Sequence, residues 1–258
     1  MVATESPIFP PKFEVIIPDN VLEIEELLRV GEGTLVDVVV SPDGHVLALS
    51  GSMGIWLYET QTLTLIEELN GHAGNVESVD WSPDGKFLVS GGHDQTVRVW
   101  DSIRGVQISL FAGHRDEVNN VVWSPDGFWI ASGGKDSALI IWEVGTSKEH
   151  IRLDGHEKGV VTVSWSPNGK LLASGGIDGV IYLWETQNWN EIYKFEDHAG
   201  WVTAFAWSRN GKLLASGSLD RTIRIWDMDT GETLHELNNL RNVAYIGLPR
   251  KPRKFYED

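Results

Sequence analysis

One interval of 42 residues organises most of this chain. It separates four histidines from one another, His72, His114, His156 and His198. The same interval is kept by the serines Ser90, Ser132, Ser174 and Ser216, by the aspartates Asp94, Asp136, Asp178 and Asp220, and by the tryptophans Trp100, Trp142, Trp184 and Trp226. A fixed period of about 40 to 45 residues predicts an array of copies of one supersecondary unit. Because each copy buries its apolar face against its neighbours, we expect one repeat array and not two separate domains.

The unit from residue 70 to residue 111 contains four short strand patterns, at 76–81, 86–90, 96–101 and 106–111. Ser82-Pro83-Asp84-Gly85 lies between the first two and is typical of a tight turn, because Pro sets the first corner and Gly accepts positive φ. Gly91-Gly92-His93-Asp94 predicts a second turn. We therefore predict four antiparallel strands joined by tight turns in each unit.

The same pattern fills residues 112–153, 154–195 and 196–237. Before these units, residues 28–69 form a divergent copy of the repeat, with Leu49 in place of the serine and Tyr58-Glu59 in place of Trp-Asp. Terminal repeats commonly differ from the others, since they meet different neighbours.

Four copies with Gly-His or Asp-His, Ser, Asp and Trp-Asp or Trp-Glu at one spacing resemble the WD-repeat β-propeller family over about residues 22–246. The segments 17–20 and 54–58 also resemble bacterial WD-repeat proteins. The resemblance implies an all-β fold, a WD-repeat propeller. Its blades here would be five complete four-stranded units, 28–69, 70–111, 112–153, 154–195 and 196–237, plus an incomplete sixth at 238–247.

The two ends of the array are expected to be unusual. We predict an extended Pro-rich N-terminal segment at 1–21, a propeller at 22–247 and a basic C-terminal tail at 248–258. Residues 22–28 resemble an outermost strand and 241–247 an innermost strand, but the two middle strands of that closing blade are missing. Unpaired strand edges are templates for pairing, so the ring is expected to stay open or to close by homo-oligomerisation.

The repeated His, Ser and Asp could be mistaken for a catalytic triad. In the WD-repeat family that this chain resembles, these residues and the Trp form a structural hydrogen-bond network in each blade. A nucleophile site needs one exposed Ser beside an oxyanion hole, whereas this sequence has four equivalent copies. Each blade offers only one such His and one such Asp, too few for a first-row metal site. We therefore predict no catalytic residue, no metal and no cofactor.

Composition excludes several kinds of partner. The formal net charge of −16 opposes binding to nucleic acid and to anionic membranes, which need clustered Lys and Arg. The chain has no cysteine, no run of 18 apolar residues and no N-terminal pattern of a secretory signal. A cytoplasmic protein is expected.

The resemblance also implies where a protein or peptide partner would bind. Family propellers commonly bind peptides at the channel end that carries the loops entering the innermost strands. The residues at those positions are Asn75, Glu77, His93, Glu117, Asn119, Lys135, Val161, Ile177, Trp201, Thr203 and Leu219. Among them, the four apolar residues in the last two complete blades predict an anchor site, and Glu77 and Glu117 are expected to meet a basic residue of the partner.

The expected function is therefore a non-catalytic scaffold that binds a protein or peptide. Two alternatives stay open: a propeller enzyme with a central-pocket site, and a detached or truncated sensor arm of a larger signalling protein. Three tryptophans break the repeat, Trp129, Trp189 and Trp201. Trp201 is expected to be an exposed anchor, and Trp189 an incidental surface ring in an outer loop.

Overall fold

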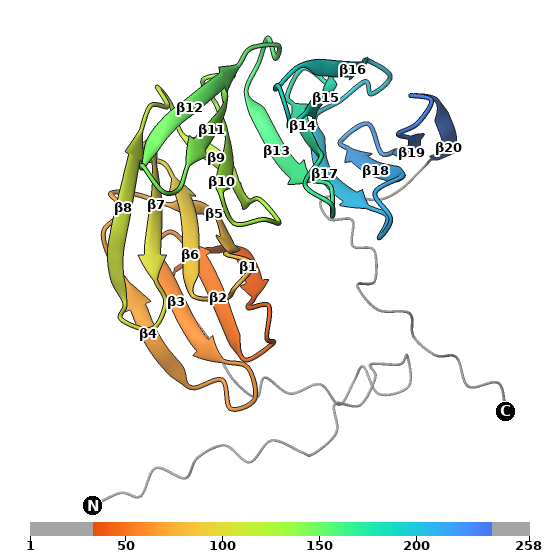
Figure 1. Ribbon diagram of the computed structural model, residues 1–258. Helices are drawn as coiled ribbons and strands as arrows, with labels where there is room; N and C mark the ends of the chain where they lie inside the picture. The colour runs from red at the N-terminus through yellow and green to blue at the C-terminus, as the bar shows by residue number, and fades with distance from the viewer. Residues whose placement is uncertain (1–32, 239–258) are drawn as a thin grey trace, which may run out of the picture.

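The structure, a computed structural model, describes residues 33–238, and these residues form twenty β-strands and no helix (Figure 1). Sheet 1 contains β1 (Leu35–Val40), β2 (Val46–Gly51), β3 (Gly54–Glu59) and β4 (Leu65–Leu69). Sheet 2 contains β5 (Val76–Trp81), β6 (Phe87–Gly92), β7 (Thr96–Asp101) and β8 (Val106–Ala112).

The remaining three sheets have the same strand order. Sheet 3 contains β9 (Val118–Trp123), β10 (Trp129–Gly134), β11 (Leu139–Glu143) and β12 (Lys148–Leu153). Sheet 4 contains β13 (Val160–Trp165), β14 (Leu171–Gly176), β15 (Ile181–Glu185) and β16 (Glu191–Phe195). Sheet 5 contains β17 (Val202–Trp207), β18 (Leu213–Ser218), β19 (Ile223–Asp227) and β20 (Thr233–Leu237).

The turns follow from their sequences. In sheet 2, Gly85 has φ +71° and donates its N–H to the Ser82 carbonyl at 2.9 Å. Ser82 Oγ accepts the N–H of Phe87 at 3.0 Å and donates to Asp84 Oδ1 at 2.7 Å. The side chains of this turn thus satisfy the backbone groups that the β5–β6 ladder leaves free.

Gly91 and Gly92 were predicted to be turn residues, and this was wrong, because both belong to β6. A Cβ added to Gly91 would lie 2.6 Å from Cγ1 of Val118 in the next sheet, and one at Gly92 would lie 2.7 Å from the Asn75 carbonyl oxygen. The pair therefore permits close approach of the neighbouring backbone and sheet. Glycine pairs also end β10 and β14.

The five sheets stand around a common channel, with β1, β5, β9, β13 and β17 innermost (Figure 1). Each sheet packs face to face on the next one along the chain. Between sheets 2 and 3, for example, Val97, Val99 and Phe111 pack on Val118 and Trp123. The predicted fold class is confirmed: all-β, with five complete four-stranded antiparallel sheets that do not close into a ring.

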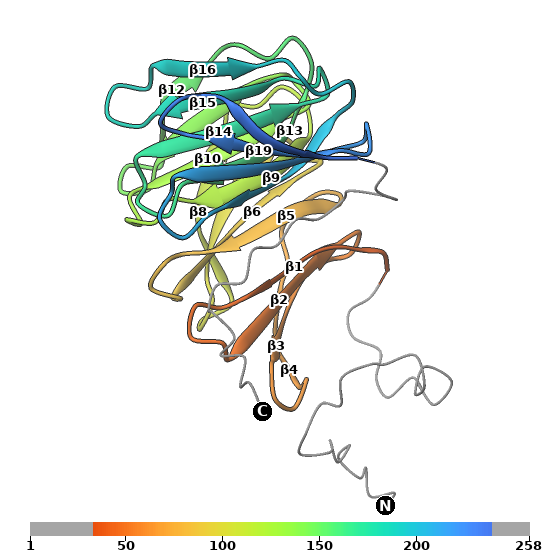
Figure 2. The same cartoon turned by 90° about the vertical axis from the view of Figure 1, so that its right-hand side faces the viewer.

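Figure 2 views the molecule toward the open side of the arc, with sheet 1 at the bottom and sheet 5 above it. The predicted strand at 22–28, residues 239–247 of the predicted sixth repeat, the N-terminal segment 1–21 and the tail 248–258 lie outside the described residues. No helix within residues 33–238 is long and apolar enough to cross a membrane.

Candidate functional site

In sheet 3, a chain of hydrogen bonds links four side chains. Trp142 Nε1 donates to Ser132 Oγ at 2.8 Å, and Ser132 Oγ lies 2.7 Å from His114 Nε2. His114 Nδ1 lies 2.9 Å from Asp136 Oδ1. Since a carboxylate only accepts, His114 Nδ1 donates its proton to Asp136. Ser132 is completely buried, so its hydroxyl bonds within the chain and does not face a substrate.

The same three contacts recur in sheets 2, 4 and 5 at 2.7–3.2 Å. They join His72, Ser90, Asp94 and Trp100; His156, Ser174, Asp178 and Trp184; and His198, Ser216, Asp220 and Trp226. Burial lowers the pKa of His72 and of His198, which favours the neutral ring. Four equal sites distributed over four sheets are an architectural device.

The aspartates also hold the loops at this end of each sheet. Asp136 accepts the N–H of Arg115, before β9, at 2.7 Å and that of Ala138, before β11, at 3.2 Å. Burial would raise the pKa of Asp220, but hydrogen bonds from Thr222 and His198 lower that pKa to about 2. Each carboxylate is therefore ionised at neutral pH and joins two loops of its sheet.

Among residues 33–238, sheet 1 shows no such network. Leu49 stands where the other sheets have the network serine, and Tyr58 where they have the tryptophan. Both pack with Trp56 in a separate buried apolar cluster. Leu49, Trp56 and Tyr58 thus bring apolar contact to the place where the other sheets have the network.

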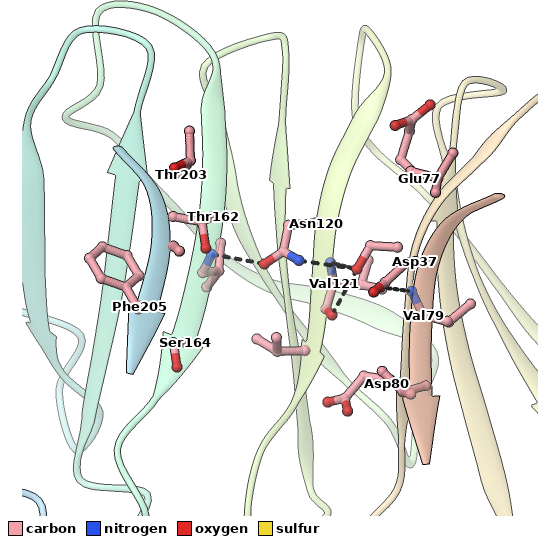
Figure 3. Close-up of a pocket in the computed structure, with 16 residues that line it drawn as sticks. Asp37, Glu77, Val79, Asp80, Asn120, Val121, Thr162, Ser164, Thr203 and Phe205 are labelled. Atoms are coloured by element: carbon pink, nitrogen blue, oxygen red, sulfur yellow. Dashed lines mark hydrogen bonds between the residues drawn. The ribbon is translucent and has the colours of Figure 1, made fainter. Parts of the chain in front are cut away.

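The innermost strands line an open cavity of about 380 Å³ in the channel (Figure 3). Its polar side chains connect neighbouring sheets. Asp37 Oδ2 accepts the N–H of Val79 at 3.0 Å, and Asn120 Oδ1 accepts the N–H of Val163 at 2.8 Å (Figure 3). Asp80 Oδ2 accepts a backbone N–H of β9 at 2.7 Å. The side chains of Asp37, Asp80 and Asn120 thus join each innermost strand to the next by hydrogen bonds.

The sequence analysis missed this set of inner-strand residues. A signal was present, because the third residue of the innermost strand is polar in four successive units: Asp37, Ser78, Asn120 and Thr162. A polar residue that recurs at one position of successive innermost strands predicts a hydrogen bond between the units. In the described part of the chain, no group of three or more His, Cys, Asp or Glu side chains could hold a metal ion.

One backbone hydrogen bond per sheet brings the predicted partner-binding residues together at one end of the channel. In each of sheets 2 to 5, the turn after the second strand donates an N–H to the carbonyl of the loop that enters the innermost strand, at 2.8–2.9 Å. The donor and acceptor residues are His93 and Asn75, Lys135 and Glu117, Ile177 and Gly159, and Leu219 and Trp201.

The apolar members of this set lie in sheets 4 and 5. Trp201 is 46% exposed and Leu219 is 54% exposed. Ile177 and Val161 are partly buried. A Cβ at Gly159 would lie 3.2 Å from Ile177 Cδ1, so the isoleucine covers the loop that enters β13.

The members with ionisable side chains lie in sheets 2 and 3 and contact one another. Glu77 Oε1 lies 2.6 Å from His93 Nε2, and Glu117 Oε2 lies 3.3 Å from Lys135 Nζ. His93 Nε2 is also 3.9 Å from Glu117 Oε2. Both glutamates, expected to meet a basic residue of a partner, therefore already face basic side chains of this chain.

Two further predicted partner-binding residues bond to the backbone of the sheets. Asn119 Nδ2 donates to the Val160 carbonyl at 2.7 Å, which links sheets 3 and 4. Thr203 Oγ1 donates to the Gly217 carbonyl at 3.4 Å within sheet 5.

Trp189 was predicted to be an incidental surface ring, and this was wrong. It is 8% exposed, and its ring centroid lies 5.9 Å from that of Trp165 and 6.0 Å from that of Trp129. The positive φ of Trp189, 59°, accompanies this inward placement of the side chain in the β15–β16 turn. Burial of a large ring between two others outweighs the backbone cost of that conformation.

Comparison with known proteins gives a match to a family and several partial matches. A model of the family described as the IFT122 first beta-propeller matches residues 34–243. The Periodic tryptophan protein 2 homolog of Neurospora crassa is 36% identical over 74 residues, which are 28% of this chain and 8% of that protein. The Intraflagellar transport protein 122 homolog of Homo sapiens is 35% identical over 71 residues, 28% of this chain and 6% of that protein.

A WD repeat-containing protein of Synechocystis is 34% identical over 77 residues, 30% of this chain and 22% of that protein. In each case, the matched segment thus spans less than a quarter of the relative's length.

Proposed function

We propose that this chain is a non-catalytic scaffold for a protein or peptide. The premise is that the chain belongs to the family of the IFT122 first beta-propeller, which is a WD-repeat propeller family. WD-repeat propellers generally act as scaffolds for protein interactions. The proposed binding surface is the channel end that carries Trp201 and Leu219. Because fold alone does not define a function, the proposal depends on what this surface presents.

The observation that carries the proposal is the exposure of Trp201. All 12 tryptophans lie within residues 33–238, and Trp201 is the only exposed one. Large aromatic side chains that lose their remaining contact with water on binding are typical hot spots, worth about 2 kcal/mol or more on truncation. Leu219 lies beside it, because its N–H donates to the Trp201 carbonyl at 2.9 Å. An apolar side chain of a partner would bury both residues.

The pairs Glu77–His93 and Glu117–Lys135 of sheets 2 and 3 define the polar side of the proposed surface. A basic residue of a partner would have to displace His93 from Glu77, or Lys135 from Glu117, since the four side chains contact one another. Such an exchange between partly exposed charges contributes little net affinity but selects the orientation of the partner. We therefore assign affinity to the apolar residues and orientation to the charged ones.

Binding and not catalysis is favoured by how the polar side chains are used. The network serines are buried, and each lies between a histidine and a tryptophan. In the channel, Asp37 and Asp80 accept backbone N–H groups of the next sheet. These side chains stabilise the fold, and Glu77, which also lines the cavity, is paired with His93 at 2.6 Å.

The experiment is capture of partners by the full chain in its native cell, identification by mass spectrometry, and measurement of Kd for the purified pair. Trp201→Ala is expected to weaken binding at least tenfold with an unchanged melting temperature. Phe128→Ala is the matched control, because this 68% exposed aromatic lies in the β9–β10 turn at the opposite channel end. Loss of binding in the Phe128 variant and normal binding in the Trp201 variant would place the site at the other end.

A further inference from the structure

Each sheet ends at the outer rim of the arc in one strand with a free edge. These outermost strands are β4, β8, β12, β16 and β20, and among the described residues each of them pairs with a single neighbouring strand (Figure 1). A free edge presents unpaired backbone N–H and C=O groups to a further strand. Proteins commonly protect such edges with charged side chains, which oppose the addition of a strand.

β8 differs from the other four outermost strands because it contains no charged residue. Its sequence is Val-Gln-Ile-Ser-Leu-Phe-Ala, seven residues against five or six in the others. Each of the others contains at least one glutamate: Glu67 and Glu68 in β4, Glu149 in β12, Glu191 in β16 and Glu236 in β20. An uncharged segment of this length, without Pro or Gly, is typical of strands that pair with further strands.

The aliphatic side chains of β8 are half exposed. Val106, Ile108 and Leu110 are 47%, 48% and 44% exposed, although Phe111 in the same strand is buried against sheet 3. Aliphatic side chains that gather at an uncharged free edge mark an interaction surface.

The polar side chains of β8 already have partners, and these contacts use side chains and not the backbone of the free edge. Gln107 Oε1 accepts a hydrogen bond from Arg98 at 2.8 Å, and Ser109 Oγ lies 2.9 Å from Ser147 Oγ of the β11–β12 turn. A bulge at Ile108 interrupts the β7–β8 ladder, but the other four outermost strands have it at the same position. The ladder is regular from Ser109 to the end of β8, where a further strand can pair.

We propose that β8 of one copy of this chain pairs with β8 of a second copy, antiparallel and about a two-fold axis, so that the two copies of sheet 2 form one continuous sheet. Charge selects this occupant, because copies with a formal net charge of −16 repel one another where acidic surfaces approach. β8 brings no like charges together when it pairs with itself, whereas the other outermost strands would bring glutamates together. The contact is isologous and therefore closes at two copies.

The apolar side chains place the two-fold axis at Leu110. In an antiparallel pair related by such an axis, one residue lies opposite its own copy, and opposite side chains point to the same face. With Leu110 at this place, Ile108 lies opposite Ala112 of the second copy, so the central pairs are all apolar.

The contact lies on the outer rim and is independent of the function proposed for the channel end of Trp201. Both copies would keep that end free, because β8 belongs to sheet 2 and Trp201 precedes β17 of sheet 5. The dimer would therefore present two partner-binding surfaces, and a partner with two matching segments would bind it by avidity.

Covalent capture tests the register, since the chain has no cysteine of its own. Opposite residues of an antiparallel pair have Cα atoms about 4.5–5.5 Å apart, within the range of a disulfide. Leu110→Cys, oxidised by glutathione disulfide, should give a disulfide-linked dimer on a non-reducing gel. Ile66→Cys is the control, because Ile66 is 49% exposed on the free-edge strand β4, and it should give at least tenfold less dimer.

Light scattering after size exclusion tests the association itself. The wild-type mass should rise with concentration to that of two copies. Ile108→Lys places a charge on the edge and should raise the Kd of the dimer at least tenfold, whereas Ile66→Lys, at the same bulge position of β4, should leave the Kd unchanged. Circular dichroism and melting curves identify a variant that fails to fold, and Leu110→Lys then replaces Ile108→Lys.

Three results would overturn the proposal: a wild-type protein that stays monomeric at every concentration, a dimer that the folded lysine variant of β8 leaves intact, and equal capture of the Leu110→Cys and Ile66→Cys variants.

Discussion

Replacing Asp136 by alanine tests whether the repeated hydrogen-bond networks stabilise the sheets. The change leaves three donors without an acceptor: His114 Nδ1 and the backbone N–H groups of Arg115 and Ala138. The His114 side chain is completely buried, so its orphaned N–H costs about 1–3 kcal/mol. Each backbone bond adds about 0.5–1 kcal/mol, the usual net contribution of one hydrogen bond. The free energy of unfolding should therefore fall by about 2–5 kcal/mol.

The assay is denaturant unfolding together with thermal melting. For a chain of this size, the expected loss corresponds to a melting temperature lower by roughly 5–15 °C. Ser52→Ala is the control, since Ser52 lies in the corresponding turn of sheet 1 and accepts only the exposed N–H of Thr34, at 3.0 Å. Its cost should stay within about 0.5 kcal/mol. Equal losses for the two variants would refute the view that the network, and not the turn, stabilises these sheets.

Three further predictions follow from single contacts. The pKa of Asp220, about 2, and the pKa of His198, below 6.5, both lie below their values in the unfolded chain, so the unfolded chain binds protons first. Melting temperatures should therefore fall as pH drops below about 6.5, and again below about 4. A flat profile from pH 7.5 to 3 would contradict this. Trp189→Ala should cost about 3–5 kcal/mol in denaturant unfolding without weakening partner binding, because it empties a buried site. Gly133→Ala should lower the free energy of unfolding by about 1–3 kcal/mol, since its Cβ would lie 2.5 Å from a side chain of the next sheet. Gly145→Ala is the control and should change it little, because nothing lies within 4 Å of that Cβ. Equal losses for the two variants would exclude the packing argument.

Much of the fold could be predicted from the sequence because the repeat fixes both local and neighbouring structure. The strand at 76–81 is β5 and that at 96–101 is β7. The same spacing places a His, a Ser, an Asp and a Trp in every intact unit, as His72, Ser90, Asp94 and Trp100 in sheet 2. Their hydrogen bonds then require the same fold of each sheet.

The features that could not be predicted depend on contacts between units. Gly91 was assigned to a turn because Gly is common in turns, but the approach of Val118 from the next sheet decides its role. The packing of Trp189 against Trp165 is made by residues that lie apart in sequence, one of them outside the repeat. His93 meets Glu77 only after the turn folds back over the innermost strand.

We propose that the partner of this propeller binds at the channel end that carries Trp201. Hydrogen–deuterium exchange of the full chain, free and saturated with its identified partner, tests it most directly. We expect slower exchange on binding at residues 199–203 and 217–221, and unchanged exchange in the Ser-Pro-Asp-Gly turns at 82–85 and 124–127 at the opposite end. Protection confined to those turns, with the loops around Trp201 unchanged, would contradict it.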